Sequence, residues 1–181
     1  MKIAITGNTS GIGQALEKVF TTNGHEVVGF SKTSGYDITN PDDRKRIINE
    51  SSDCNIFINN AYHKYSQCEL LFEAWYAWQG QHKRIVNISS GAAAWWQHTQ
   101  RVGEENYKTA KMALESASEI LWNKGPWPSV TIARPCLTDT PRVASITGLK
   151  KALPEHFAEI LYNNLINQNF RIQMLAVSLD P

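Results

Sequence analysis

A tyrosine and a lysine four residues apart are the strongest catalytic candidates in this sequence. Tyr107 and Lys111 fall in a stretch with helical periodicity, so their side chains are expected on one face of a helix. A free phenol titrates near ~10, and a nearby ammonium lowers that pKa because it favours the phenolate. A surface helix pair without chemistry is the alternative, but the surrounding motifs favour acid–base work in which Lys111 tunes Tyr107.

A glycine-rich turn provides the second candidate site. Residues 6–13 read TGNTSGIG and separate an expected strand from an expected helix. At this position a dinucleotide pyrophosphate meets free backbone N–H groups and the positive end of the helix. Gly7 permits a tight turn, Gly11 permits close approach of the phosphates, and Gly13 permits close packing of helix on strand. A β-α turn that binds no ligand is the alternative interpretation.

The elements that position these residues alternate along the chain. Short apolar runs predict strands at residues 2–6, 26–30, 54–58, 84–88, 129–133 and 172–177. Apolar periodicity and capping signals predict helices at residues 11–22, 41–50, 66–79, 107–122 and 155–166. The first β-α-β unit implies parallel strands. The sequence therefore predicts an α/β fold, a doubly wound parallel sheet of Rossmann type, in a single domain over residues 1–181.

The overall composition narrows the classes of function. The 181 residues include 42% apolar positions, which is enough for one core, and 18 basic against 17 acidic residues give a net charge of +1. A net charge this close to zero produces no positive electrostatic field that would attract nucleic acid or an anionic membrane. The pattern of the first residues favours neither a signal peptide nor a membrane span, so we expect neither. Cys54, Cys68 and Cys136 have no metal-ligand spacing. We expect a cytoplasmic protein with reduced thiols and no metal.

The order of the motifs resembles the short-chain dehydrogenase/reductase family. TGxxxGIG is the glycine spacing of its short-form members, and residues 107–111 match its YxxxK motif. Residues 59–61, read as NNA, follow a strand as the family's NNAG does, with Tyr62 in place of glycine. Residues 85–90 look like its serine strand, and residues 134–140 are similar to its PGxxxT segment, with Cys136 where glycine is usual. The five matches span residues 6–140.

The resemblance implies three catalytic residues, Tyr107, Lys111 and Ser90. In the family the tyrosine gives a proton to a substrate carbonyl oxygen while hydride arrives from the nicotinamide, and the lysine also holds the nicotinamide ribose. Ser90 matches the serine that hydrogen-bonds the same oxygen, with Ser89 as the fallback. Asp37 and Ile38 resemble the adenine-binding pair, although Asp37 is equally explained as a turn residue.

The cofactor choice follows from the end of the second expected strand. An acid there would bind the adenosine ribose and repel a 2′-phosphate, but the sequence has Ser31-Lys32-Thr33, two hydroxyls and a cation. This favours NADP(H) over NAD(H), although Lys32 is also explained as a solvated lysine. The predicted cofactor-binding residues are Gly7, Ser10, Gly11, Ile12, Gly13, Ser31, Lys32, Thr33, Asp37, Ile38, Asn60, Ala61, Tyr107, Lys111, Pro135, Leu137 and Thr140.

The sequence departs from the family in length. Members commonly have about 250 residues, whereas here the segment between Ala61 and Ile85 has room for one helix and lacks the asparagine of the family's proton relay. The tail beyond Thr140 is also short. Trp95 and Trp96 are expected beside the substrate, where they line a pocket or are buried in a dimer interface or under the shortened helix.

The main hypothesis is an NADP(H)-dependent oxidoreductase that transfers hydride between nicotinamide and a small carbonyl or alcohol substrate. The alternative is a catalytically weak or inactive NADP(H)-binding sensor or partner protein on the same fold, favoured by the missing asparagine and by Cys136. A nucleotide-sugar epimerase is a weaker third hypothesis. We expect a homodimer or homotetramer, and no nucleic-acid or membrane partner. The identity of the substrate stays open.

Overall fold

Six parallel strands form one sheet in the order β2-β1-β3-β4-β5-β6. The structure, a computed structural model, describes residues 1–94, 104–166 and 170–179, so Trp95 and Trp96 lie outside the described residues. The strands are β1 (Lys2–Thr6), β2 (Glu26–Phe30), β3 (Ile56–Asn59), β4 (Arg84–Ile88), β5 (Ser129–Arg134) and β6 (Met174–Ala176). The predicted parallel sheet is confirmed.

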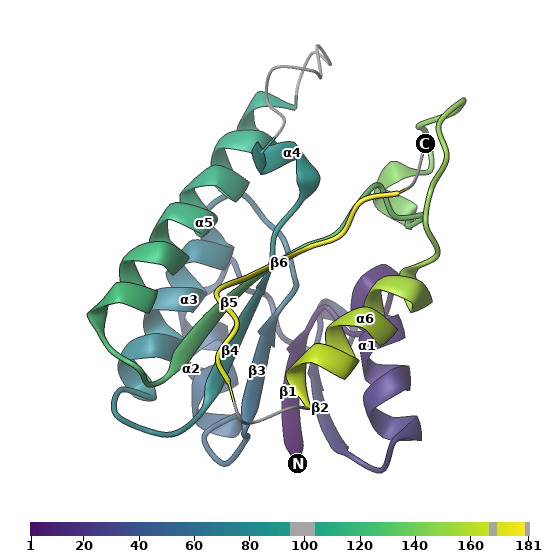
Figure 1. Cartoon of the computed structure of the whole chain (residues 1–181). Coiled ribbons are helices and arrows are strands. Elements are labelled where there is room, and N and C mark those ends of the chain that lie inside the picture. The colour runs from purple at the N-terminus through teal and green to yellow at the C-terminus, as the bar shows by residue number, and fades with distance from the viewer. Residues whose placement is uncertain (95–103, 167–169, 180–181) are drawn as a thin grey trace.

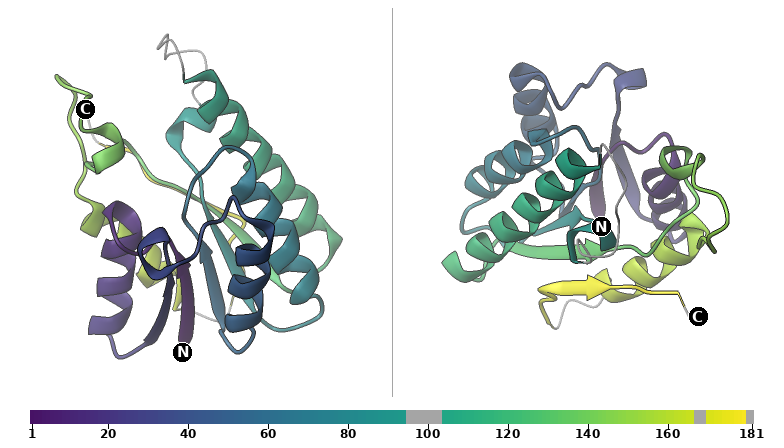
Figure 2. Two further views of the ribbon diagram at one scale, coloured as in Figure 1. Left: turned by 180° about the vertical axis from the view of Figure 1, so that it is seen from behind. Right: turned by 90° about the horizontal axis from the view of Figure 1, so that it is seen from above.

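Helices cover both faces of the sheet (Figures 1 and 2). The main helices are α1 (Gly11–Thr22), α2 (Pro41–Glu50), α3 (Ser66–Ala77), α4 (Gly91–Ala94), α5 (Glu105–Lys124) and α6 (Pro154–Leu165), with 3₁₀ turns η1 (Lys32–Ser34) and η2 (Pro141–Val143). One face carries α1 and α6, and the other carries α2, α3 and α5. No helix in the described part of the chain is long and apolar enough to cross a membrane.

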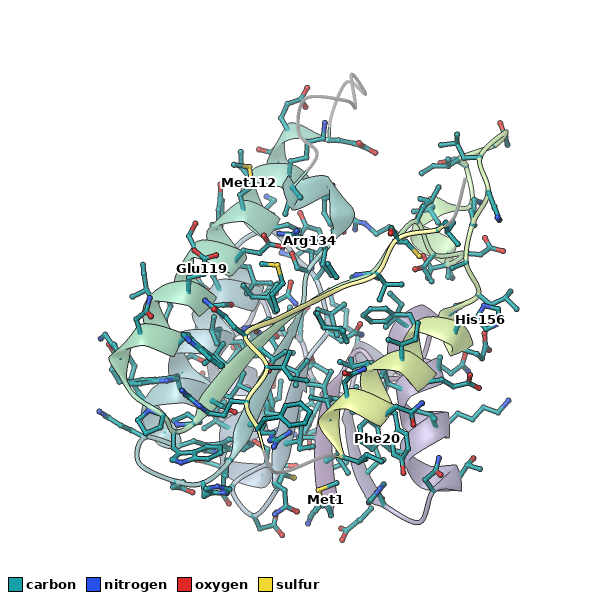
Figure 3. All side chains as sticks on the ribbon, viewed as in Figure 1. Met1, Phe20, Met112, Glu119, Arg134 and His156 are labelled. Atoms are coloured by element: carbon teal, nitrogen blue, oxygen red, sulfur yellow. The ribbon has the colours of Figure 1, made fainter. Side chains whose placement is uncertain are left out.

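Each face has its own apolar core because the central strands are buried on both sides. All four residues of β3 and all five of β4 are buried, as expected where helices cover both faces of a parallel sheet. On one face Phe20 of α1 is fully buried and meets Tyr162 of α6 edge to face at 5.3 Å between ring centroids, between the two helices in Figure 3. Glu119 and Met112 point away from the sheet on the outer side of α5.

The predicted elements are all present, with shifted ends. The strand expected at residues 54–58 begins at Ile56, because the Cys54 N–H donates to the Ser51 carbonyl at 2.9 Å in the turn that ends α2. The helix expected at 107–122 is longer at both ends, and the sequence missed α4 and both 3₁₀ turns. Between β3 and β4 there is one helix, α3, as the short intervening segment predicted.

The topology places a ligand site at the carboxyl ends of β1 and β3. From β1 the chain crosses to β2 on one side, and β3 pairs with β1 on the other. In open parallel sheets this change of direction leaves a crevice beyond the strand ends, where ligands bind. The glycine turn follows β1, and Asn60 and Ala61 follow β3, so two predicted binding segments meet at this crevice.

Candidate active site

The glycine turn after β1 has the conformation that a phosphate-binding turn needs. Gly7 and Gly11 have φ values of +69° and +53°, in the left-handed region that side chains rarely adopt. At Gly13 the constraint is contact, because an added Cβ would lie 2.1 Å from the Gly7 carbonyl oxygen. Both the turn and the close packing of α1 on it therefore depend on glycine.

Asn60 and Thr6 tie this turn to the neighbouring strand. The Thr6 hydroxyl accepts hydrogen bonds from the backbone N–H groups of Asn60 at 2.9 Å and Ala61 at 3.0 Å. The Asn60 amide donates to the carbonyl oxygens of Thr6 at 2.9 Å and Gly7 at 3.2 Å. Asn60, predicted as a cofactor contact, thus also fixes the shape of the turn.

The first turn of α1 is suited to an anion. Ser10 is the N-cap residue, but its side chain makes no capping hydrogen bond, and the first turn contains no acidic residue. The first N–H groups of a helix have no partner within the helix and carry its positive dipole end. Thr140 closes this side, since its methyl group lies 3.1 Å from the position that a Cβ on Gly11 would take. The turn and the first residues of α1, Ile12 included, therefore fit a pyrophosphate.

A pocket of about 230 Å³ adjoins the turn on the β2 side. Its lining includes five residues predicted to bind the cofactor: Gly7, Ser31, Lys32, Ile38 and Ala61. A second hollow of about 780 Å³ runs along α1 from Ser10 and Gly11 to Thr22, and the start of α6 at Pro154 and Glu155 also borders it. The lining of this second hollow includes none of Ser90, Tyr107 and Lys111. Among the described residues, only the 230 Å³ pocket therefore adjoins the turn at residues predicted to bind the adenosine half of the cofactor.

Lys32 has an acidic partner that the sequence analysis did not foresee. Its ammonium lies 2.8 Å from the Asp37 carboxylate, and hydrogen bonds from Lys32 and from the Thr39 N–H lower the pKa of Asp37 to about 2. Ser31 is buried, and its hydroxyl forms hydrogen bonds with the hydroxyls of Thr33 at 2.9 Å and Ser34 at 3.0 Å. The end of β2, where the sequence has no acidic residue, is therefore approached by the Asp37 carboxylate from the segment after η1.

Lys111 is buried beside the Tyr107 ring. Its ammonium is 5.8 Å from the ring centroid and donates hydrogen bonds to the Gln67 side-chain oxygen and the Ile88 carbonyl, both at 2.7 Å. The side chain is only 3% exposed. Burial lowers the pKa of Lys111 from its ordinary 10.5 to about 7, and the positive charge of Arg142 adds to that shift. The predicted Tyr–Lys pair is thus brought together.

Gln67 is a site residue that the sequence analysis missed. Besides accepting from Lys111, its amide donates to the carbonyl oxygens of Asn59 at 2.6 Å and Ile88 at 3.1 Å. The Asn59 amide in turn donates to the Gln67 carbonyl and the Asn87 side chain, both at 2.9 Å. The sequence does contain a signal for Gln67, because this polar residue lies among the apolar residues on the buried face of α3.

The structure separates the two candidate serines. Ser89 is buried and donates to the Glu115 carboxylate at 2.5 Å, and Glu115 also pairs with Arg134 at 2.6 Å. Ser90, on the opposite face of the chain, is partly exposed, and its oxygen accepts the Ala92 N–H at 3.2 Å as α4 begins. Ser90 directly precedes α4, which packs on α5, and the structure binds the Ser89 hydroxyl, but not the Ser90 hydroxyl, to a carboxylate of the described residues.

Two further side chains surround Tyr107. Tyr62, which replaces the glycine of the family motif, meets the Tyr107 ring edge to face at 4.9 Å. Arg142, from η2, places its guanidinium carbon 3.9 Å from the Tyr107 centroid and 4.5 Å from that of Tyr62. Burial raises the pKa of Tyr62, against the lowering effect of Arg142.

The segment after β5 completes the edge of the site. The Pro135 carbonyl accepts the Gly91 N–H at 3.3 Å, and the Leu137 carbonyl accepts the Ala152 N–H at 2.8 Å. These bonds hold the 134–140 segment between α4 and the strand-like residues near 152. Thr140 is thereby carried to the glycine turn.

The comparisons with known proteins agree with this fold. No family model and no curated protein match the sequence. Among solved structures, a "short chain dehydrogenase/reductase family protein" is similar at 20% identity and a TM-score of 0.78, with 98% of this chain and 95% of that chain covered. The 3-alpha-hydroxysteroid dehydrogenase of Pseudomonas sp. B-0831, complexed with NADH, is similar at 17% identity and a TM-score of 0.78, with 98% of this chain and 95% of that chain covered. The closed form of serine dehydrogenase, complexed with NADP⁺, is similar at 17% identity and a TM-score of 0.78, with 100% of this chain and 95% of that chain covered. The similarity confirms the fold of these dehydrogenases over nearly the whole chain.

The contact at Gly13 generates a stability prediction. Gly13→Ala forces a methyl group against the Gly7 carbonyl, and we expect it to lower the free energy of unfolding by ~2 kcal/mol or more. Gly125→Ala is the matched control, since its backbone is extended and nothing lies within 4 Å of the added Cβ. Urea unfolding of both variants is the measurement, and equal stability of the two would contradict the packing described here.

The burial of Lys111 generates a pH prediction. The folded pKa of about 7 is below the ordinary 10.5, so the folded protein binds fewer protons between these values and its stability rises with pH across that window. Lys111→Met removes this contribution. We expect the stability of the wild type relative to Lys111→Met to rise by up to ~1.4 kcal/mol per pH unit from pH 7 to 10. Lys18→Met, exposed on α1, is the control and should follow the wild-type slope.

Proposed function

We propose that this chain is an oxidoreductase of short-chain dehydrogenase/reductase type, which uses NADP(H) to interconvert a carbonyl and an alcohol on a small molecule. The observation that carries the proposal is the buried Lys111 ammonium beside the Tyr107 ring, at the edge of the sheet where the glycine turn lies. A buried charge without an anionic partner is costly, and its position beside a phenol gives it a chemical role. The similar structures with bound NADH and NADP⁺ support the same cofactor class.

The residues divide the work of carbonyl reduction. The Tyr107 hydroxyl donates the proton to the carbonyl oxygen, and the Lys111 ammonium stabilises the phenolate that this leaves. The Ser90 hydroxyl donates a hydrogen bond to the same oxygen and holds it in place. Gln67 and the Ile88 carbonyl fix the ammonium by hydrogen bonds of 2.7 Å. When bound, the nicotinamide supplies or accepts the hydride.

The cofactor is held at two places according to this proposal. The glycine turn and the first turn of α1 bind the pyrophosphate, and Ser31, Lys32 and Thr33 face the adenosine ribose from the 230 Å³ pocket and its rim. Lys32 is 69% exposed at its side chain, so it is free to turn from Asp37 to a 2′-phosphate. A dianionic phosphate attracts an ammonium more strongly than the single, partly exposed Asp37 carboxylate does. The support for NADP(H) is therefore the attraction of Lys32, which acts against the repulsion from Asp37.

Self-association remains part of the proposal. Met112 is 41% exposed and Ile120 57% exposed on α5, and Tyr76 is 56% exposed on the neighbouring α3. These apolar side chains on the outer side of the two helices support the homo-oligomer expected from the sequence.

The first test is Tyr107→Phe. We expect it to lower turnover of a reducible carbonyl roughly 10²- to 10⁴-fold, because the general acid is lost while the ring contacts remain. NADPH binding should persist, seen as a rise in the unfolding temperature that corresponds to ~2.7 kcal/mol at about 100 times the dissociation constant. Tyr76→Phe, exposed on α3, should match the wild type in both respects.

Other results would separate the alternatives. Binding of NADPH by the wild type without turnover across a carbonyl panel would favour the sensor or partner protein over the enzyme. Full turnover by Tyr107→Phe would exclude Tyr107 as the proton donor. A wild type that neither NADPH nor NADH stabilises would remove the cofactor proposal altogether.

Cofactor preference gives a second test at the Lys32–Asp37 pair. Lys32→Met should weaken NADPH binding roughly 10-fold with little effect on NADH, because only NADPH carries the 2′-phosphate. Asp37→Asn should raise the NADPH-to-NADH affinity ratio by up to ~5-fold, since it releases Lys32 from a partly exposed ion pair and removes a negative charge near the 2′-phosphate. Lys45→Met, which breaks a comparable exposed pair with Asp42 on α2, is the control. An unchanged ratio in both site variants would exclude Lys32 from 2′-phosphate recognition.

A further inference from the structure

Arg142 places a positive charge against the proposed proton donor. Its guanidinium carbon is 3.9 Å from the Tyr107 centroid and 4.5 Å from the Tyr62 centroid, so it covers the edge-to-face pair that the two rings make. Arg142 lies in η2, directly after Thr140 and Pro141, which border the glycine turn. The side chain thus reaches from the cofactor side of the site to the catalytic helix.

This guanidinium has no carboxylate partner among the described residues. Asp139, the acid nearest in sequence, lies 3.4 Å from Lys151 instead, and Glu115, an acid on the catalytic helix, is bound to Arg134 at 2.6 Å. Arg44, by contrast, contacts the carboxylates of Glu69 and Glu73, both at 3.0 Å. Among the described residues, the charge of Arg142 is met by the two tyrosine rings and by a hydrogen bond to the Tyr62 side chain, and none of these partners is a carboxylate.

A second cation increases the demand for an anion here. The Lys111 ammonium lies 5.8 Å from the Tyr107 centroid and 5.2 Å from the Tyr62 centroid, so it and Arg142 approach the same pair of rings. The positive charge of Arg142 contributes to the lowered pKa of Lys111, which is the sign of repulsion between them. An anion beside the rings would relieve this repulsion and give Arg142 a bidentate partner.

We propose that Arg142 binds a carboxylate of the substrate, so that the compound interconverted here is an oxo acid and its hydroxy acid. The inference rests on the proposed function, since it places the carboxylate within reach of a carbonyl oxygen bound at Tyr107. Reduction adds a hydride from NADPH to the carbonyl carbon and a proton from Tyr107 to the oxygen, and leaves the carboxylate unchanged. Arg142 is then the residue that selects the class of substrate.

Matched substrates isolate the contribution of charge. The test compares kcat/KM for phenylglyoxylate with that for its methyl ester, which keeps the reacting ketone and removes the negative charge. The wild type should prefer the acid, and Arg142→Met should reduce the acid-to-ester ratio roughly 10- to 100-fold, the range of a hydrogen bond to a charged group. Arg142→Lys should keep part of the ratio, because it keeps the charge but loses the bidentate geometry.

Arg171 provides the matched control. Its guanidinium carbon stacks 4.3 Å from the Trp122 ring near the far end of α5, about 22 Å along the helix from Tyr107. Arg171→Met removes the same kind of cation–π contact and the same charge, and it should leave the acid-to-ester ratio at the wild-type value. A ratio that falls equally in both variants would show only an effect of net charge and would overturn the proposal.

The cofactor phosphates are the competing partner of Arg142. If Arg142→Met weakens NADPH binding and leaves the acid-to-ester ratio unchanged, Arg142 serves the cofactor and the proposal is wrong. A calorimetric titration of phenylglyoxylate and its ester into the protein with NADP⁺, where no reduction occurs, separates binding from turnover. Binding of the acid that is lost in Arg142→Met supports the inference even if the wild type reduces nothing, in which case only the proposed function fails. Equal binding by wild type and Arg142→Met overturns it.

Discussion

A buried ammonium group sets the requirements for the structure around it. Lys111 is held in an environment that penalises its charge, and its hydrogen bonds to the Gln67 side chain and the Ile88 carbonyl stabilise it there. Because a charged group out of water needs its hydrogen bonds at good distances, α5 must pack with Lys111 at the end of β4. α3 must likewise present Gln67 there. The position of the proposed catalytic helix thus follows from one electrostatic constraint.

The hydrogen bonds that Lys111 requires also explain how one short helix between β3 and β4 can connect these strands to α5. Gln67 stands at the start of α3, eight residues after Asn59, and it binds both that strand end and the ammonium. The neighbouring Asn87 amide continues the chain of hydrogen bonds to the Ser118 hydroxyl on α5 at 2.9 Å. One helix therefore connects β3, β4 and α5 through buried polar contacts, in a region where the sequence had indicated a missing relay residue. The side-chain amide of Gln67, from this segment, binds the ammonium directly.

The sequence predicted what depends on local pattern. Apolar runs and periodicity gave the alternation of strands and helices, and the glycine spacing gave a turn whose left-handed residues are Gly7 and Gly11. The motif order placed Tyr107 and Lys111 on one helix. The sequence did not predict contacts between side chains from distant parts of the chain, such as Gln67 with Lys111 and Arg142 with Tyr107. The motif position favoured Ser90 over Ser89, but only the packed structure shows that the Ser89 hydroxyl is bound to the Glu115 carboxylate.

The distribution of charge argues for small anionic ligands even though the net charge is only +1. Acidic side chains near the site are engaged elsewhere: Glu69 and Glu73 with Arg44, and Glu115 with Arg134. The first turn of α1 has no acid, and Lys111 and Arg142 converge on the same rings. A field of this kind is screened within about 8 Å at physiological salt, so it does not gather polyanions onto the surface. It acts at the carboxyl edge of the sheet, where a dinucleotide and the charged end of a small substrate would each find a cation.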